Sequence, residues 1–231
     1  MYTQQDISQL VNKCKSNLDL NKPDPNLSFP KSLPICILEA VFSMNVRNKS
    51  SNNVWKRYME YYGILADPNT GICKPEHTIN DFINNANSFH SVDDFIDNVL
   101  KNRQRTSPTN GMLKAEAAIQ VAKAFQNNGF NSLNDFNNTN YSHSQLDADI
   151  CMVKGQSSGI MLKYLYMLAG STNTCKPDRM LQKFIKSDNP HIEGNDIQSI
   201  MTDLVKLLNP KYPNLSVRGL DYLIWDYQRQ Q

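Results

Sequence analysis

The fold is decided by residues 153–159, Val153-Lys154-Gly155-Gln156-Ser157-Ser158-Gly159, where two glycines interrupt an apolar helical pattern. Apolar residues recur with helical spacing from Leu146 to Met152 before this stretch and from Ile160 to Leu168 after it. Gly155 and Gly159 permit positive φ angles and close approach of the backbone to a ligand. The sequence therefore predicts a helix, a tight hairpin and a second helix. An ordinary turn between two packed helices is the alternative interpretation of the same glycines.

The hairpin has the features of an anion site. Successive main-chain N–H groups at a turn that opens a helix N-terminus bind anions, and a DNA phosphate is a natural occupant. The chain carries a net charge of only +2, but local basic patches set phosphate affinity. One such patch is the run Lys101, Arg103 and Arg105, followed by Lys114 and Lys123. Solvated helix faces are the alternative explanation of such patches.

A single carboxylate among basic side chains follows the hairpin. Asp178 lies 23 residues after Gly155 and directly after Pro177, which suits the first turn of a helix. Between positions 154 and 186 it is the only acid among six basic residues: Lys154, Lys163, Lys176, Arg179, Lys183 and Lys186. If these cations are close, they keep Asp178 ionised. An ionised Asp178 facing a deoxyribose would stabilise a sugar cation or orient a water. Alternatively, it stabilises the dipole of a helix.

Length and composition limit the class of protein. The 231 residues, 40% of them apolar, suffice for one large domain or two small ones. Five cysteines without C-x-x-C spacing predict a reducing compartment, with no disulfide, zinc or iron–sulfur site. The N-terminus has no signal-peptide pattern, and no apolar run approaches the ~18 residues of a membrane span. We therefore expect a cytoplasmic protein that does not span a membrane.

Helical periodicity dominates and alternation typical of strands is nearly absent, which predicts an all-α, bilobal helical bundle. Besides the two hairpin helices and a first helix around residues 7–14, we expect helices over 35–44, 54–62, 79–86, 91–101, 114–127, 177–185, 196–208 and 217–227.

The hairpin and Asp178 together resemble the helix-hairpin-helix DNA glycosylase superfamily, which includes endonuclease III and the adenine glycosylases. In that family a hairpin L-P-G-V-G precedes a helix and then a V-D-T-H turn with a catalytic aspartate. The stretch from Val153 to Ser157 matches the hairpin, with Ser157 in place of the second glycine. Asp178 matches the aspartate, with one extra residue in the intervening segment.

Two further segments agree with this resemblance, which runs from roughly residue 33 to residue 186. The stretch from Met112 to Ile119 resembles the family's helix that begins K-A-x-x-I. The stretch from Leu38 to Asn45 resembles the first long core helix, which ends in a loop inserted into DNA. The resemblance implies a single glycosylase domain over 1–231 with a DNA-binding cleft between two lobes. One lobe covers about 40–140, and the other covers about 1–39 plus 141–231 with the hairpin and the catalytic acid.

The resemblance also implies residue roles. Glu39 stands three residues before Phe42, at the position of the glutamate that acts as general acid on the flipped base in adenine glycosylases. A buried glutamate has a raised pKa, which suits an acid at neutral pH. The alternative is a buried glutamate paired with a core lysine or arginine. Asn45 and Arg47 match the wedge that fills the gap left by the flipped nucleotide. An ordinary polar loop is the alternative for both.

The position of the family's nucleophilic lysine is occupied by Gly159, which predicts a monofunctional enzyme with weak or absent lyase activity. Lys154 and Lys163 lie near enough in sequence to keep that question open. Lys163 and Tyr164 are candidates for the base pocket, although a core role is the alternative for any single aromatic residue. The family's four-cysteine iron–sulfur motif is absent, and the hairpin backbone is a candidate site for a bound K⁺ or Na⁺.

The resemblance therefore predicts a monomeric DNA glycosylase acting on a flipped damaged or modified base in double-stranded DNA, leaving an abasic site. Alkylated purine is the conventional substrate. Glucosylated hydroxymethylcytosine of phage DNA, excised as antiviral defence, is a second hypothesis. A non-catalytic helix-hairpin-helix module that binds DNA, and a helical regulator that binds a protein partner, are alternatives of other classes.

Overall fold

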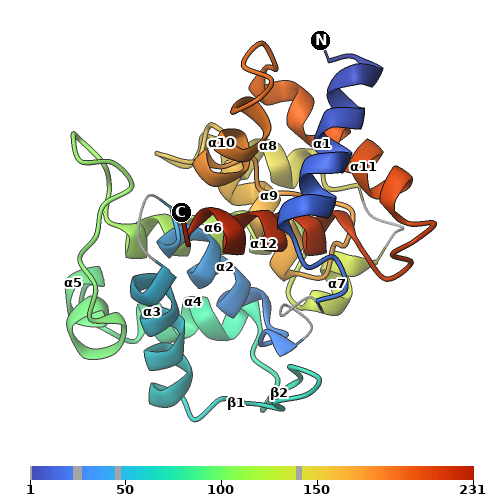
Figure 1. The fold of residues 1–231 in the computed structure, drawn as a ribbon. Helices are drawn as coiled ribbons and strands as arrows, with labels where there is room; N and C mark the ends of the chain where they lie inside the picture. The colour runs from blue at the N-terminus through green and yellow to red at the C-terminus, as the bar shows by residue number, and fades with distance from the viewer. Residues whose placement is uncertain (1, 23–27, 45–47, 139–141) are drawn as a thin grey trace. The chain divides into compact units, whose positions relative to one another are not determined.

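The computed structural model describes residues 2–22, 28–44, 48–138 and 142–231, and it is predominantly helical (Figure 1). The all-α prediction is confirmed. The chain divides into two compact units, which are described separately. Unit 1 combines Met1–Pro25 with Gly170–Gln231, and unit 2 is Asn26–Ala169. The 153–159 hairpin therefore belongs to unit 2, whereas the sequence prediction placed it in one lobe with Asp178.

Helix α2 (Leu33–Phe42) is the central helix of unit 2, and all of its residues are buried. A helix that is apolar on every side is stable only in a core. Helices α3, α6 and α9 pack against α2. The elements of unit 2 that follow α2 are α3 (Asn48–Tyr61), β1 (Leu65–Ala66), β2 (Cys73–Lys74), α4 (Ile79–Asn87), α5 (Val92–Phe95), the π-helical turn η2 (Ile96–Leu100), α6 (Lys114–Asn127), α7 (Leu133–Asn137), α8 (Ser144–Met152) and α9 (Ile160–Leu168).

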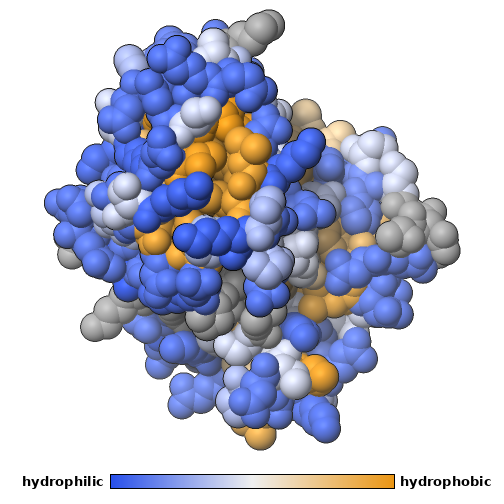
Figure 2. Space-filling view, turned by 45° about the vertical axis from the view of Figure 1, so that its right-hand side comes forward, coloured by the Kyte–Doolittle hydropathy of each residue, from blue (hydrophilic) through white to orange (hydrophobic). Residues whose placement is uncertain are grey.

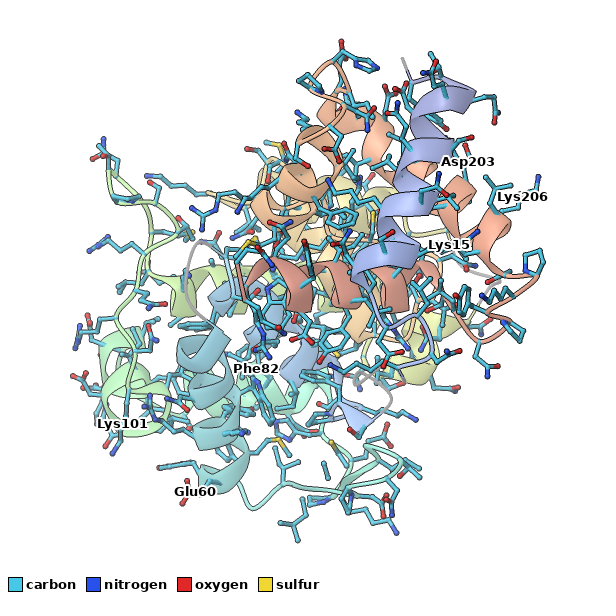
Figure 3. All side chains as sticks on the ribbon, in the orientation of Figure 1. Lys15, Glu60, Phe82, Lys101, Asp203 and Lys206 are labelled. Carbon is cyan, nitrogen blue, oxygen red and sulfur yellow. The ribbon has the colours of Figure 1, made fainter. Side chains whose placement is uncertain are left out.

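The core of unit 2 explains why the hairpin is part of it. Val153 at the start of the hairpin is buried, as are Met161, Leu162 and Leu165 on α9, and all four join the same hydrophobic cluster as α2. Figure 3 shows Phe82 of α4 among the packed side chains of this unit, whereas Glu60 and Lys101 lie at its surface. The apolar face of α9 therefore anchors the hairpin to α2.

Unit 1 has a second hydrophobic core, formed by α1 (Gln4–Asn17), α10 (Arg179–Lys186), the 3₁₀ turn η3 (Gly194–Asp196), α11 (Ile197–Leu208) and α12 (Val217–Gln228). Helix α1 packs on α11, and α12 packs on both α10 and α11. Thr3 and Asp6 form a capping box that starts α1.

Figure 2 shows one face of the molecule, on which hydrophilic residues surround a patch of apolar ones. Among the described residues, no helix is both long and apolar enough to cross a membrane.

Several boundaries differ from the sequence predictions. Helix α3 begins at Asn48, six residues before the predicted start. Apolar periodicity could not predict this start, because the first turns of the helix consist of polar residues. The pair β1–β2 was not predicted, since strands of two residues are too short for an alternating pattern. Its turn is held by Asp67, whose Oδ1 accepts hydrogen bonds from the amides of Asn69 and Thr70.

His77 gives unit 2 a pH-dependent stability. It is buried, with Nε2 2.6 Å from the Tyr58 hydroxyl, and burial lowers its pKa below the usual 6.5. The unfolded chain therefore binds a proton at higher pH than the folded chain does. The free energy of unfolding is therefore highest, as far as His77 is concerned, above about pH 6.5. It falls as the pH drops from there through the pKa of His77 in the folded protein. We expect denaturant unfolding between pH 7.5 and pH 5.5 to show this loss. His77→Gln should flatten the dependence and His90→Gln, at an exposed histidine, should not; equal slopes in all three proteins would contradict the assignment.

Candidate DNA-contacting hairpin and acidic residues

Residues 153–159 form a tight turn between α8 and α9. The amide of Gln156 donates to the carbonyl oxygen of Val153 at 2.9 Å, and the amide of Gly159 donates to that of Gln156 at 3.1 Å. Gly155 has φ +90° and Gly159 has φ +67°. Both glycines therefore use the positive φ angles that the sequence led us to expect. Gly159 is the N-cap of α9. The predicted helix, turn and helix are present with the predicted start and end of α9.

The two glycines differ in what surrounds them. A Cβ on Gly155 would lie 2.5 Å from Cβ of Thr106, a buried residue of the loop that precedes α6. A Cβ on Gly159 would meet nothing within 4 Å. Gly155 is therefore required both by its conformation and by close packing, whereas Gly159 is required by its conformation alone.

The hairpin presents backbone amides that the protein itself does not use. The N–H groups of Gly155, Ser157 and Ser158 make no hydrogen bond to another described residue. Lys154, Gly155, Ser157 and Ser158 are exposed. Three unbonded amides beside an exposed lysine, just before the N-terminus of α9, form a surface that an anion such as phosphate can bind.

Gln156 is a feature that sequence reasoning missed. Its side chain is 2% exposed, and its Oε1 has no hydrogen-bond partner among the described residues. The side chain points inward where the family hairpin has a valine. The burial of Gln156 between the exposed residues Gly155 and Ser157 follows from the backbone conformation, which the sequence alone does not reveal.

Asp178 caps the N-terminus of α10 in unit 1. Its Oδ1 accepts hydrogen bonds from the amides of Met180 at 2.9 Å and Leu181 at 3.2 Å. The helix therefore begins at Arg179, two residues after the predicted start, with Pro177 outside it. Asp178 is half-buried, and no hydrogen bond of its Oδ2 to a described residue is present. One carboxylate oxygen thus serves the helix, and the other is available for a second role.

The basic residues near Asp178 lie on or beside α10. Arg179 and Lys183 are exposed, and Lys176 and Lys186 are half-buried. Lys154 and Lys163, the other two basic residues between positions 154 and 186, belong to unit 2. The basic run between 154 and 186 is therefore divided between the two units.

Glu39 and Tyr164, both candidates from the sequence, meet inside unit 2. Glu39 is the only charged residue of α2 and is 2% exposed. The hydroxyl of Tyr164, on α9, donates to Glu39 Oε1 at 3.3 Å. Tyr164 itself is half-buried and packs against the core of the unit. Lys163 is half-buried. The carboxyl group expected to be a general acid is therefore hydrogen-bonded to the helix that starts at the hairpin.

Lys114, at the start of α6, holds the C-terminal end of α2. It is 1% exposed, and its Nζ donates to the carbonyl oxygens of Phe42 at 3.0 Å and Met44 at 2.7 Å. The last carbonyl groups of a helix have no partner within the helix, so they need a donor from elsewhere. A cation at this end also interacts favourably with the negative end of the helix dipole. Asn45 and Arg47, the predicted wedge, lie outside the described residues.

We expect Lys114→Met to lower the free energy of unfolding by about 1–3 kcal/mol, because the methionine removes the donor to the buried Phe42 carbonyl oxygen and to the partly buried Met44 carbonyl oxygen. Urea unfolding would measure the loss. Lys123→Met, at an exposed lysine of the same helix, is the control and should change stability by less than about 0.5 kcal/mol. Equal stabilities of the two variants would mean that the hydrogen bonds from Lys114 to the Phe42 and Met44 carbonyl oxygens contribute nothing net.

The cysteines do not form an evident metal site. All five have free thiols, and burial raises the pKa of Cys14 to about 12. Within the described ranges, no group of three or more histidine, cysteine, aspartate or glutamate side chains is arranged to hold a metal ion.

Fold and site together define an all-α protein of two helical units, with an amide-presenting hairpin and a buried glutamate in one and a helix-capping aspartate in the other. A family model matches residues 8–229, and the chain belongs to that family, described as a domain of unknown function, DUF8548. Comparison with curated proteins gives no match, and comparison with solved structures gives none.

Proposed function

We propose that this protein is a monofunctional DNA glycosylase of the helix-hairpin-helix type, which hydrolyses the N-glycosidic bond of a damaged or modified base in double-stranded DNA. The observation that carries the proposal is the hairpin, whose unbonded amides lie beside the exposed Lys154. Gly155 and Gly159 have positive φ in this hairpin, and Gly155, Ser157 and Ser158 are exposed residues. The hairpin would bind a DNA phosphate, and we propose that its carbonyl groups also hold a K⁺ or Na⁺ ion.

The proposed reaction needs two acidic residues with different protonation states. The bond between C1′ and the base nitrogen breaks, and its electron pair leaves with the base. Glu39, protonated, gives its proton to the departing base. Asp178, ionised, stabilises the positive charge on the sugar and then accepts a proton from the water whose oxygen bonds to C1′. The products are the free base and an abasic site, and proton exchange with solvent restores both carboxyl groups.

The burial of Glu39 supports its part in this scheme, because removing a carboxyl group from water disfavours the charged form. Water is the proposed nucleophile, since Gly159 stands where a lysine would be needed to form a Schiff base. Asn45 and Arg47 are proposed to fill the gap left by the flipped nucleotide. We propose a cytoplasmic enzyme that acts as a monomer and needs no iron–sulfur cluster.

We propose two classes of substrate base. Alkylated purines would place the enzyme in repair, whereas glucosylated hydroxymethylcytosine of phage DNA would place it in antiviral defence. The two proposals differ in the size of the base pocket, for which Lys163 and Tyr164 are the candidate residues.

The decisive experiment is mass spectrometry of bases released from a panel of DNAs containing alkylated, oxidised, deaminated and phage-type modified bases. We expect one class of base to be released by the wild type, with alkali-labile abasic sites left in the DNA. Glu39→Gln should release the same base much more slowly. If no DNA of the panel yields a free base or an abasic site, the proposed activity is wrong.

A non-catalytic DNA-binding module is the second candidate, favoured by the capping role of Asp178, which explains that residue without chemistry. Such a module would bind DNA with an affinity that falls steeply with salt, because lysine and hairpin contacts replace counterions on phosphates. Salt-dependent binding without base release would support it. Absence of salt-dependent binding would instead favour a regulator that binds protein.

A further inference from the structure

The hydrogen bond between Tyr164 and Glu39 suggests a specific use for this tyrosine. We propose that Tyr164 is a positioning residue, whose hydroxyl holds the Glu39 carboxyl group in the orientation that delivers a proton to the departing base. This inference rests on the proposed function. It specifies a role for Tyr164, which the sequence predicts only as a candidate for the base pocket.

The first argument is the placement of the two residues. Glu39 is on α2, the central helix of unit 2, and Tyr164 is on α9, which begins at the hairpin. The hydroxyl of Tyr164 lies 3.3 Å from Glu39 Oε1 and donates to it. The residue lies five positions after Gly159 on a helix that packs directly on α2. Tyr164 thus connects the acid to the element proposed to fix the position of the DNA.

The second argument is the packing of the ring. Tyr164 is half-buried and its ring contacts the core of unit 2. A ring that packs against the protein and directs its hydroxyl at a carboxyl group is poorly placed to cover a base with its face. A buried carboxyl group has several side-chain rotamers, and a fixed donor selects one of them. Catalytic geometry must be held within a fraction of an ångström, so the loss of this donor should slow the chemical step.

The neighbouring tyrosine of the same helix provides a matched control. Tyr166 is also half-buried, but its hydroxyl donates to Asp147 Oδ1 at 2.8 Å and lies 3.0 Å from His143 Nδ1. Tyr166→Phe therefore removes a hydroxyl from α9 without touching Glu39. A general effect of losing a tyrosine hydroxyl on this helix would appear in both variants.

The test measures single-turnover base release and DNA affinity for the wild type, the control Tyr166→Phe, and the variants Tyr164→Phe, Tyr164→Leu, Glu39→Gln and Tyr164→Phe/Glu39→Gln. We expect Tyr164→Phe to slow release by about tenfold, the usual size of one hydrogen bond's effect, with unchanged DNA affinity. Tyr166→Phe should keep the wild-type rate. In the Glu39→Gln background, Tyr164→Phe should cause no further loss, because the positioned acid is already gone.

Two results would overturn the inference. Full activity of Tyr164→Phe combined with a large loss in Tyr164→Leu would show that the ring, and not the hydroxyl, matters. An equal loss from Tyr164→Phe with and without Glu39 would show that the two residues act independently.

A different result would reject the proposed function alone. If the wild type releases no base, thermal unfolding of the wild type, Tyr164→Phe, Glu39→Gln and the double variant decides whether the two side chains are coupled. Melting-temperature losses that do not add in the double variant would retain Tyr164 as the residue that orients Glu39. Additive losses would reject the link between hydroxyl and carboxyl group as well.

Discussion

Asp178→Asn is expected to abolish base release while leaving the protein as stable as the wild type. Asparagine and aspartate are equally good N-cap residues, so the amides of Met180 and Leu181 keep an acceptor. The substitution removes the negative charge that would stabilise the sugar cation and accept a proton from water. The loss in single-turnover rate should be at least about a hundredfold, the usual contribution of one group in general acid–base catalysis. Denaturant unfolding and base release on the same preparations check the two halves of this result.

Asp178→Ala is the matched comparison, because it removes the charge and the cap together. It should lose the same activity and, in addition, about 0.5–2 kcal/mol of stability. An Asp178→Asn protein that keeps its rate would leave Asp178 with the capping role alone. That outcome, together with salt-dependent DNA binding, would favour the non-catalytic module over the enzyme.

The sequence predicts best those helices whose apolar spacing is uninterrupted. The bounds of α6, Lys114–Asn127, and of α9, Ile160–Leu168, agree with the prediction, because apolar residues recur through each and a turn residue marks one end. The start of α3 was missed because polar residues have no periodic signal. The bounds of the two units could not be predicted from the sequence either, because they depend on contacts between residues far apart in the chain.

The candidate site was predictable as a set of residues but not as an arrangement. Glu39 and Tyr164 are separated by 125 residues, so only the packing of α9 on α2 brings them together. The position of Asp178 near the start of a helix predicted a dipole role as the alternative to catalysis, and the structure shows that it is the N-cap itself. The carbonyl-binding role of Lys114 had no local signal, because its partners Phe42 and Met44 are 72 and 70 residues away in the sequence.

Gly155→Ala is expected to destabilise the protein more than Gly159→Ala does. A non-glycine residue with positive φ costs roughly 1–2 kcal/mol. At Gly155 the new Cβ would also lie 2.5 Å from Cβ of Thr106, and such overpacking typically costs about 1–3 kcal/mol more. The free energy of unfolding should therefore fall by about 2–5 kcal/mol. Gly159→Ala, with open space around it, should lose only the first part.

A second substitution separates the two costs. Thr106→Gly removes the side chain that a Cβ at position 155 would strike, but keeps the backbone hydrogen bond from Thr106 to the carbonyl oxygen of Met112. Relative to Thr106→Gly alone, the double variant Gly155→Ala/Thr106→Gly should lose only the conformational part of the cost. If Gly155→Ala costs no more than Gly159→Ala, the loop before α6 yields easily and does not hold the hairpin. If the double variant recovers the packing part of the cost, the clash with the Thr106 side chain accounts for the extra loss of stability in Gly155→Ala.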